Sequence, residues 1–239
     1  MSLSFVNWAV DVFEDPVFVP TVPPGLKLDD MILVYHSGVQ NRCISYDAAA
    51  VNGIIYDNIL IDGKQFEISV VCCPLSFSPT IYTGRWRFDG QVYKDKTIVL
   101  TNRMGDKLIH LTGTHAEKPF KLPIRIQVHV DILRNVLTDY SDPHFMLFKK
   151  PTIMPTMNET APPHKLVYLV GYRSVSNPDH SYRFSIVIPK KNVYNTRRNK
   201  FSTYYKKMRR KMRDKEAIII STFLSVAAAY FPDATIIEI

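Results

Sequence analysis

Residues 54–72, with the sequence IIYDNILIDGKQFEISVVC, decide the fold of this chain. Two runs rich in β-branched residues, Ile54–Ile61 and residues 65–72, flank the dipeptide Asp62-Gly63. Asp-Gly between two such runs is the strongest short-range signal of a two-residue hairpin turn, because both turn positions need a positive φ. The stretch therefore predicts two antiparallel strands joined by a tight turn.

The same pattern extends outward on both sides of this hairpin. Asp89-Gly90 separates a second pair of β-prone runs, and Met104-Gly105-Asp106 predicts a third reversal. Further strands are predicted at residues 31–36, 42–46, 80–88, 91–92, 97–100 and 107–112, and later in the chain at 166–172 and 182–188. The expected body is a mostly antiparallel sheet system of the α+β class, rich in strand.

Two segments are expected to contain helix. Alternating apolar and polar residues from 124 to 131 fit either a half-buried strand or, from Val128 onward, the start of a helix that runs to Tyr140. The apolar window 217–231 predicts a buried C-terminal helix. This window is shorter than the roughly 20 residues that a membrane-spanning helix needs, so no transmembrane span is expected.

Prolines divide the chain into four expected segments. Residues 1–30 contain four prolines, which disfavour helices and central strands, and are expected to form an extended N-terminal arm. Residues 31–150 form the β-rich body, and a Pro-rich connector follows at 151–163. Residues 164–239 contain the second strand pair and the C-terminal helices, and are expected to pack with the body as one unit.

The positive charge of the chain is concentrated in residues 190–215. This segment holds 12 of the 30 Lys and Arg residues and one of the 22 acidic residues, although the formal net charge of the whole chain is only +8. Phe201, Tyr204, Tyr205 and Met208 recur at helical spacing, so the segment predicts a basic amphipathic helix with one packing face. The cations expected to contact a partner are Arg197, Arg198, Lys200, Lys206, Lys207, Arg209, Arg210, Lys211 and Arg213.

Two kinds of partner fit this basic segment. One is an acidic surface on other protein subunits of an assembly, since a basic helix face is common in proteins that bind no nucleic acid. The other is nucleic acid or another polyanion, for which each neutralised phosphate strengthens binding in a salt-dependent way. The sequence leaves both alternatives open.

Cys73, at the end of an apolar strand and directly before Pro74, is the candidate nucleophile. A reactive thiolate needs a nearby cation or histidine that lowers its pKa, and His110 is the candidate partner among several histidines. The alternative is a core role, because free cysteines are among the most buried residues. Three cysteines, with one adjacent pair that cannot easily form a bridge, suit an intracellular, reducing compartment.

Motifs for metals and cofactors are missing from the sequence. The histidines and cysteines lack the Cys-x-x-Cys and His-Glu-x-x-His spacings of zinc sites, and the nine glycines form no phosphate-binding loop. No metal and no cofactor is therefore expected. Arg85-Trp86-Arg87-Phe88 interleaves cations with aromatic rings, which fits either base stacking or a sheet face with Trp86 in the core.

Five short motifs, in the same order, resemble the signature of an uncharacterised prokaryotic domain family whose pattern includes Tyr-Cys-Pro-Leu-Cys. They are Ser45-Tyr46-Asp47, Tyr56-Asp57, Cys72-Cys73-Pro74-Leu75-Ser76, Phe88-Asp89-Gly90 and Asn102-Arg103. Ser76 stands where that family has its second cysteine, so a metal or redox role that needs two cysteines does not carry over. The resemblance implies a β-rich body and carries no activity with it.

The leading function hypothesis is a non-enzymatic structural or docking protein within a larger assembly, which contacts its partners through the basic surface. A minor capsid component of a virion is one such assembly protein. Two alternatives come from other classes. One is a thiol-dependent enzyme centred on Cys73, and the other is a module that binds nucleic acid without sequence preference through the basic segment.

Overall fold

The computed structural model describes residues 3–5, 12–73, 76, 78–93, 97–111, 113–115, 123–148, 166–174, 183–188 and 215–238. The chain divides into two compact units, residues 1–157 and 158–239. The fold is α+β and rich in strand, with mostly antiparallel sheets, which confirms the predicted fold class. The predicted division into an arm, a body, a connector and a C-terminal segment stays a prediction.

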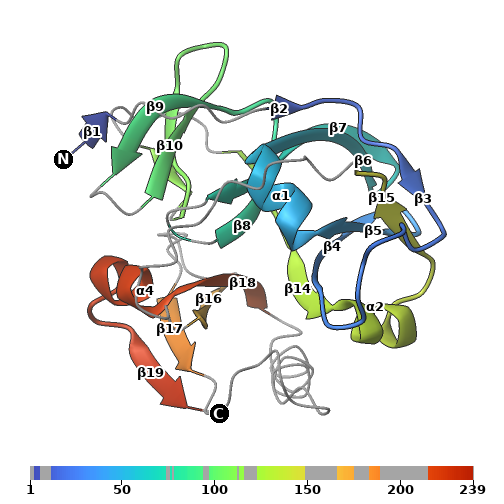
Figure 1. Ribbon diagram of the computed structural model, residues 1–239. Helices are drawn as coiled ribbons and strands as arrows, with labels where there is room; N and C mark the ends of the chain where they lie inside the picture. Colours follow the sequence, from blue (N-terminus) through green and yellow to red (C-terminus); the bar gives the residue numbers. More distant parts are fainter. Residues whose placement is uncertain are drawn as a thin grey trace. The chain divides into compact units, whose positions relative to one another are not determined.

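The first unit contains three five-stranded sheets, each named here after its middle strand (Figure 1). The β10 sheet has the order β1 (Leu3–Phe5), β9 (Arg87–Tyr93), β10 (Thr97–Thr101), β11 (Lys107–Ile109) and β12 (Thr114–His115). The β7 sheet has the order β13 (Arg125–Ile126), β8 (Ser78–Thr83), β7 (Lys64–Cys73), β6 (Ile54–Ile61) and β2 (Val12–Phe13). The β5 sheet has the order β14 (His129–Ile132), β4 (Met31–Ser37), β5 (Gln40–Ser45), β15 (Pro143–Met146) and β3 (Phe18–Val19).

The hairpin at Asp62-Gly63 is confirmed. Strand β6 pairs antiparallel with β7 over its whole length, from Ile54 opposite Val71 to Ile61 opposite Lys64. Asp62 and Gly63 have φ values of 49° and 74°, the left-handed conformation that a two-residue turn of this kind requires at both positions. The reversal at residues 104–106 is confirmed too, because Thr101 lies opposite Lys107.

The second half of β7 and the start of β6 are buried on both faces. One face contributes Ile55, Val70 and Cys72 to a core shared with strands β4 and β5. The other face contributes Ile54, Val71 and Cys73 to a core shared with strands β9, β10 and β11. Successive residues of a strand point to opposite faces, so a strand covered on both sides needs an unbroken apolar run instead of an alternating one.

Two short helices pack onto this system of sheets. The helix α1 (Tyr46–Asn52) begins after Ser45, whose hydroxyl accepts a hydrogen bond from the Ala48 amide at 3.2 Å, and its buried alanines join the core between the β5 and β7 sheets. The helix α2 (Leu133–Asp139) buries Leu133 and Val136 against the other face of the β5 sheet. The helix α1 was not predicted from the sequence.

The predicted hairpin at Asp89-Gly90 is wrong. Both residues lie inside β9, which pairs with β10 from Thr97 opposite Tyr93 to Thr101 opposite Arg87, with a shift of register between Ile98 and Leu100. Gly90 has a φ of 89°, and the Gln91 amide donates to the Asp89 carboxylate. The positive φ is therefore absorbed within an irregular strand, and the chain reverses only after Tyr93.

Residues 124–140 contain both of the predicted structures, first strand and then helix. Its first part forms β13 at the edge of the β7 sheet, and after a break it forms β14 at the edge of the β5 sheet. The helix α2 follows directly. Ile124 is 60% exposed, so the alternating pattern does not mark one continuous half-buried strand.

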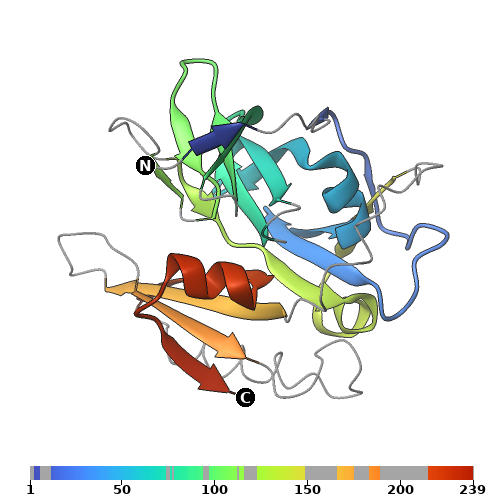
Figure 2. The same cartoon turned by 60° about the vertical axis from the view of Figure 1, so that its left-hand side comes forward.

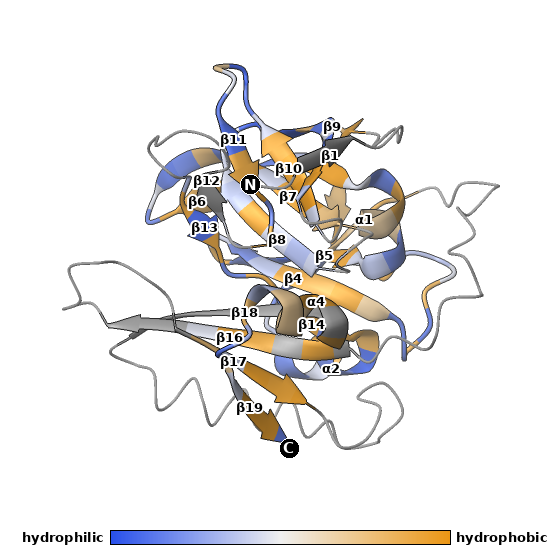
Figure 3. Cartoon of the chain, turned by 90° about the vertical axis from the view of Figure 1, so that its left-hand side faces the viewer, coloured by the Kyte–Doolittle hydropathy of each residue, from blue (hydrophilic) through white to orange (hydrophobic). Residues whose placement is uncertain are grey.

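The second unit contains a four-stranded sheet. Its order is β18 (Lys215–Phe223), β16 (Leu166–Ser174), β17 (Arg183–Ile188) and β19 (Thr235–Glu238), with β19 parallel to β17. The helix α4 (Leu224–Tyr230) lies against one face of this sheet (Figure 2). The buried residues of β16 and β17 include Val167, Leu169, Ile186 and Val187. In Figure 3 the coloured part of β17 is mainly hydrophobic.

The predicted C-terminal helix over residues 217–231 is only partly right. Residues up to Phe223 belong to β18, which pairs with β16 along its full length, and only α4 is helical. The run Ile218-Ile219-Ile220 is β-branched, and such side chains pack well on a pleated surface. The predicted basic amphipathic helix lies outside the described residues.

Candidate functional site

Cys73, the candidate nucleophile, lies at the end of β7 with no exposed surface. Its neighbours are apolar and include Val71, Tyr82 and Trp86. Cys73 pairs across the ladder with Ser78 of β8. A substrate therefore has no direct path to this sulfur in the described arrangement.

His110, the candidate base, is fully buried and held at both ring nitrogens. Nε2 lies 2.8 Å from the carbonyl oxygen of Ser78, which can only accept, so Nε2 carries the proton. Nδ1 lies 2.9 Å from the Thr80 hydroxyl and accepts from it. Burial lowers the pKa of His110 to about 3, and the nearby Arg125 guanidinium acts in the same direction. The imidazole is a neutral structural bridge between β8 and the end of β11.

A second layer of hydrogen bonds holds the main chain around His110. The Tyr82 hydroxyl donates to the His110 carbonyl. Arg125 Nη2 donates to the Tyr82 hydroxyl at 2.7 Å and to the Leu111 carbonyl at 2.9 Å, and its guanidinium lies over the Tyr82 ring at 5.2 Å. Cys73 thus lies on β7 and His110 directly after β11, in two different sheets, and the imidazole bonds to β8, the neighbour of β7. Both side chains are buried.

The other two cysteines are also unsuited to nucleophilic chemistry. Burial raises the pKa of both Cys43 and Cys72 to about 12. The thiol is the only form present at neutral pH when the pKa lies that high, and the thiolate is the reactive form. Cys72 and Cys73 project to opposite faces of the β7 sheet, so this adjacent pair does not form one site.

We expect the three free thiols to be inert toward a disulfide reagent such as Ellman's reagent in the native protein. All three should react in concentrated guanidinium chloride, because unfolding removes the burial that shields them. Rapid reaction of one thiol in the native state, with a reactivity midpoint well below pH 8, would instead favour the thiol-dependent enzyme.

The nine candidate cations of the basic segment, from Arg197 to Arg213, all lie outside the described residues. Within the described part of the chain, Trp86 of the Arg85–Phe88 motif is a core residue, and its indole nitrogen donates to the Thr83 carbonyl at 3.0 Å. Arg85 lies 3.3 Å from Glu67 and stacks over the Tyr56 ring. The core interpretation of this motif is the one that the geometry favours.

The first unit also contains an ion pair between two strands that was not predicted from the sequence. Asp57 of β6 forms an ion pair with Arg42 of β5 and accepts a hydrogen bond from the Tyr35 hydroxyl at 2.8 Å. Burial, followed by the charge of Asp57, raises the pKa of Tyr35 well above its usual value. Arg42 also donates to the Asn58 carbonyl and stacks over the Phe18 ring at 4.8 Å. These contacts fasten the β5 sheet to the β7 sheet.

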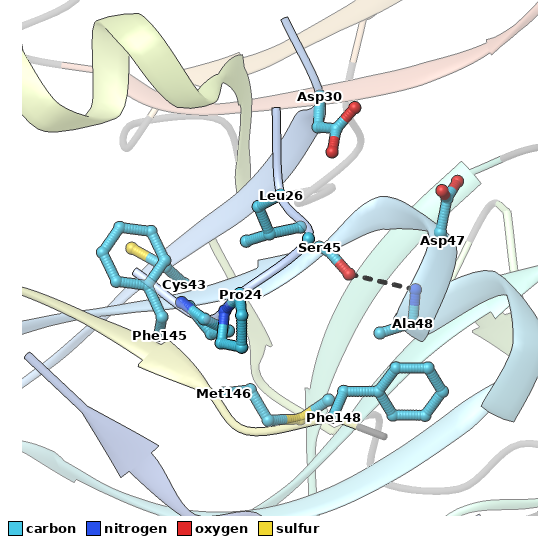
Figure 4. A pocket seen from close by; sticks show the side chains of 12 residues that line it. Pro24, Leu26, Asp30, Cys43, Ser45, Asp47, Ala48, Phe145, Met146 and Phe148 are labelled. Carbon is cyan, nitrogen blue, oxygen red and sulfur yellow. Dashed lines mark hydrogen bonds between the residues drawn. The ribbon is translucent and has the colours of Figure 1, made fainter. Parts of the chain in front are cut away.

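The described surface also contains a pocket that the sequence did not predict (Figure 4). Its walls come from three regions: the loop at 23–30, the junction of β5 with α1, and β15 together with Phe148, two residues after its end. The lining residues are Pro23, Pro24, Gly25, Leu26, Asp30, Cys43, Ser45, Asp47, Ala48, Phe145, Met146 and Phe148. The lining residues range from Pro23 to Phe148 in the sequence, so no local pattern could have indicated the pocket.

Neither a metal site nor a membrane span is found among the residues that the structure describes. No group of three or more His, Cys, Asp and Glu side chains is arranged to hold a metal ion there. The helices in the same residues are all too short or too polar to cross a membrane. Comparison of the chain with protein-family models, with curated proteins and with solved structures gave no match.

Proposed function

We propose that this chain is a non-enzymatic docking protein that binds an acidic protein surface through the basic segment at residues 190–215. The observation that carries the proposal is the burial of Cys73 and His110. The alternative hypothesis, a thiol-dependent enzyme, needs both of these side chains to be accessible. Cys73 is buried among apolar side chains, and both ring nitrogens of His110 are occupied by internal hydrogen bonds. A catalytic base must be within reach of a substrate proton, and His110 is not.

The charge distribution of the chain indicates that the partner is negatively charged. The basic segment carries a net charge of +11, and the rest of the chain is slightly acidic. Such a concentration of one sign attracts an oppositely charged partner over about one Debye length and raises the rate of association. The remaining alternative, nucleic acid, offers the same sign of charge and differs in its phosphate chemistry.

Binding to three fluorescent probes at about 50 to 200 mM salt tests the proposal. The probes are a poly-glutamate peptide, an unrelated single-stranded DNA and an unrelated RNA. We expect the peptide to bind at least as tightly as the nucleic acids, with an affinity that falls as salt rises. Tighter binding of DNA and RNA, with a steep salt slope, would assign the segment to nucleic acid, and no binding of any probe would refute a polyanion-binding role.

Charge reversal locates the binding surface. The triple variant Arg209→Glu, Arg210→Glu, Lys211→Glu should weaken peptide binding by at least about tenfold, or 1.4 kcal/mol. The matched control changes the net charge equally at three exposed cations of the first unit, Lys27→Glu, Lys64→Glu and Arg103→Glu. Equal losses in both triple variants would mean that total charge, and not the basic segment, governs binding.

A further inference from the structure

The pocket beside α1 is built from segments that other contacts hold in place. Strand β15 runs parallel to β5, with Phe145 opposite Cys43. The Ser45 side chain is fixed by its hydrogen bond to the Ala48 amide. These two contacts set the positions of the walls that β5, α1 and β15 contribute.

The loop that closes the pocket is anchored at Asp30. The Asp30 carboxylate accepts from the Lys27 amide at 2.8 Å, and the Asp30 carbonyl accepts from the Leu133 amide at 2.9 Å. The loop thus bends back on itself and is attached to the first residue of α2. The pocket is therefore largely formed before any ligand arrives, which lowers the entropic cost of binding.

The lining separates into an apolar side and an acidic side. Cys43, Phe145 and Met146 are buried, and Phe148 is half-buried beside them. Burial raises the pKa of Cys43 to about 12, so its sulfur is an uncharged part of the apolar lining. In Figure 4 the carboxylates of Asp30 and Asp47 lie toward one side of the pocket, and Met146 and Phe148 lie toward the other.

Among the residues that the structure describes, no side chain neutralises the two carboxylates of the pocket. Neither Asp30 nor Asp47 forms an ion pair with another described residue, whereas the buried Asp57 is paired with Arg42. Asp30 is partly buried, and Asp47 is exposed in the first turn of α1. A ligand that reaches this side of the pocket meets negative charge.

We infer that this pocket is a binding site for a small organic amine that carries an ammonium group on an alkyl chain. The alkyl chain lies against Phe145, Met146 and Phe148, and the ammonium group lies between Asp30 and Asp47. Charge complementarity selects the cation over an alcohol or a carboxylate of the same length. All lining residues belong to the first unit, so the site does not depend on the basic segment.

Methionine methyl NMR of the full chain tests this site directly. The protein is labelled with carbon-13 at the methionine methyl groups and titrated at pH 7 with butylamine, hexylamine, hexanol and hexanoate. We expect a saturable shift of the Met146 methyl signal with the amines and a smaller or absent shift of Met104, which is 81% exposed outside the pocket. Each added methylene should tighten binding by up to about fourfold, because about 0.8 kcal/mol is gained per buried CH₂.

Charge variants separate the site from non-specific binding. Asp30→Asn and Asp47→Asn should each weaken hexylamine binding by up to about fivefold, the range measured for a partly exposed ion pair. Asparagine keeps the oxygen that accepts from the Lys27 amide, so the loop at Asp30 stays anchored. The matched control Asp29→Asn removes the same charge one residue away from the lining and should leave affinity within twofold.

Several outcomes would overturn the inference. Equal affinity for hexylamine and hexanol would show that Asp30 and Asp47 do not contribute to binding. Parallel, non-saturating shifts of Met146 and Met104 would mean an adventitious additive only. No shift of the Met146 signal at any amine concentration would show that the pocket binds no amine.

Discussion

Replacing Asp57 by alanine should cost about 3 kcal/mol of unfolding free energy, the low end of the range for breaking a buried ion pair. The Asp57 side chain is 6% exposed and that of Arg42 is 19% exposed, so the guanidinium that loses its partner regains only part of its hydration. The Tyr35 hydroxyl, which is fully buried, loses its acceptor at the same time. Urea denaturation measures the change in the free energy of unfolding.

Two comparisons identify the cause of that loss. Asp29→Ala removes an exposed carboxylate and should change stability by less than about 0.5 kcal/mol. The triple variant Tyr35→Phe, Arg42→Met, Asp57→Leu replaces all three polar side chains of the group and should be more stable than Asp57→Ala. A loss below about 1 kcal/mol for Asp57→Ala would contradict the proposed coupling of the two sheets.

The protein should lose about 2 kcal/mol of stability between neutral pH and about pH 5 because of His110 alone. Its folded pKa is about 3, against an ordinary value of 6.5 in the unfolded chain. Between these two values the unfolded state binds a proton that the folded state does not, so stability falls as the pH falls. Urea denaturation at several pH values above about pH 5, where most carboxylates are still ionised, measures this slope.

The contribution of His110 can be separated from that of the other histidines. His110→Gln should be less stable than the wild type at neutral pH, but its stability should fall less steeply toward pH 5. If His110→Gln does not fold, NMR of the wild-type protein can measure the protonation of His110 directly. The ring proton signals of His110 should not titrate between pH 8 and about pH 5 in the native protein, and a midpoint near 6.5 would contradict the buried neutral state.

Local turn chemistry predicted one hairpin correctly and misplaced another. At Asp62-Gly63 long β-prone runs flank the turn on both sides, and tertiary pairing agrees with the local signal. At Asp89-Gly90 the second flank is short, and the apolar strand β10 pairs with the chain on both sides of the dipeptide. An Asp-Gly dipeptide allows a turn, but the available pairing partner decides whether the turn forms.

The missed and misassigned helices have two different causes. The start of α1 carries a readable local signal, since Ser45 precedes Asp47 and three alanines, and Gly53 follows the last turn. Residues 217–223 carry no such signal. A short, uniformly apolar run fits a buried helix and a buried strand equally well, and only its pairing with β16 distinguishes them.

The candidate sites differ in how far the sequence could define them. The sequence identified Cys73 and His110 as chemically capable residues, but their burial depends on strands from distant parts of the chain. The pair formed by Arg42 and Asp57 and the pocket lined by Phe145 are likewise products of long-range pairing. Residue type therefore indicated candidate chemistry, and only the tertiary structure determined access to it.

The pairing of β15 with β5 has a consequence for synthesis on the ribosome. Residues 41–43 of the β4–β5 hairpin pair with residues 143–145, so about 100 further residues must be translated first. At roughly 5–20 residues per second, this edge of the hairpin stays open for roughly 5–20 s after its own translation. Ile32, Val34 and Cys43 are without their neighbours from α2 and β15 during that time, which makes the nascent β4–β5 hairpin a target for chaperones that bind exposed apolar strands.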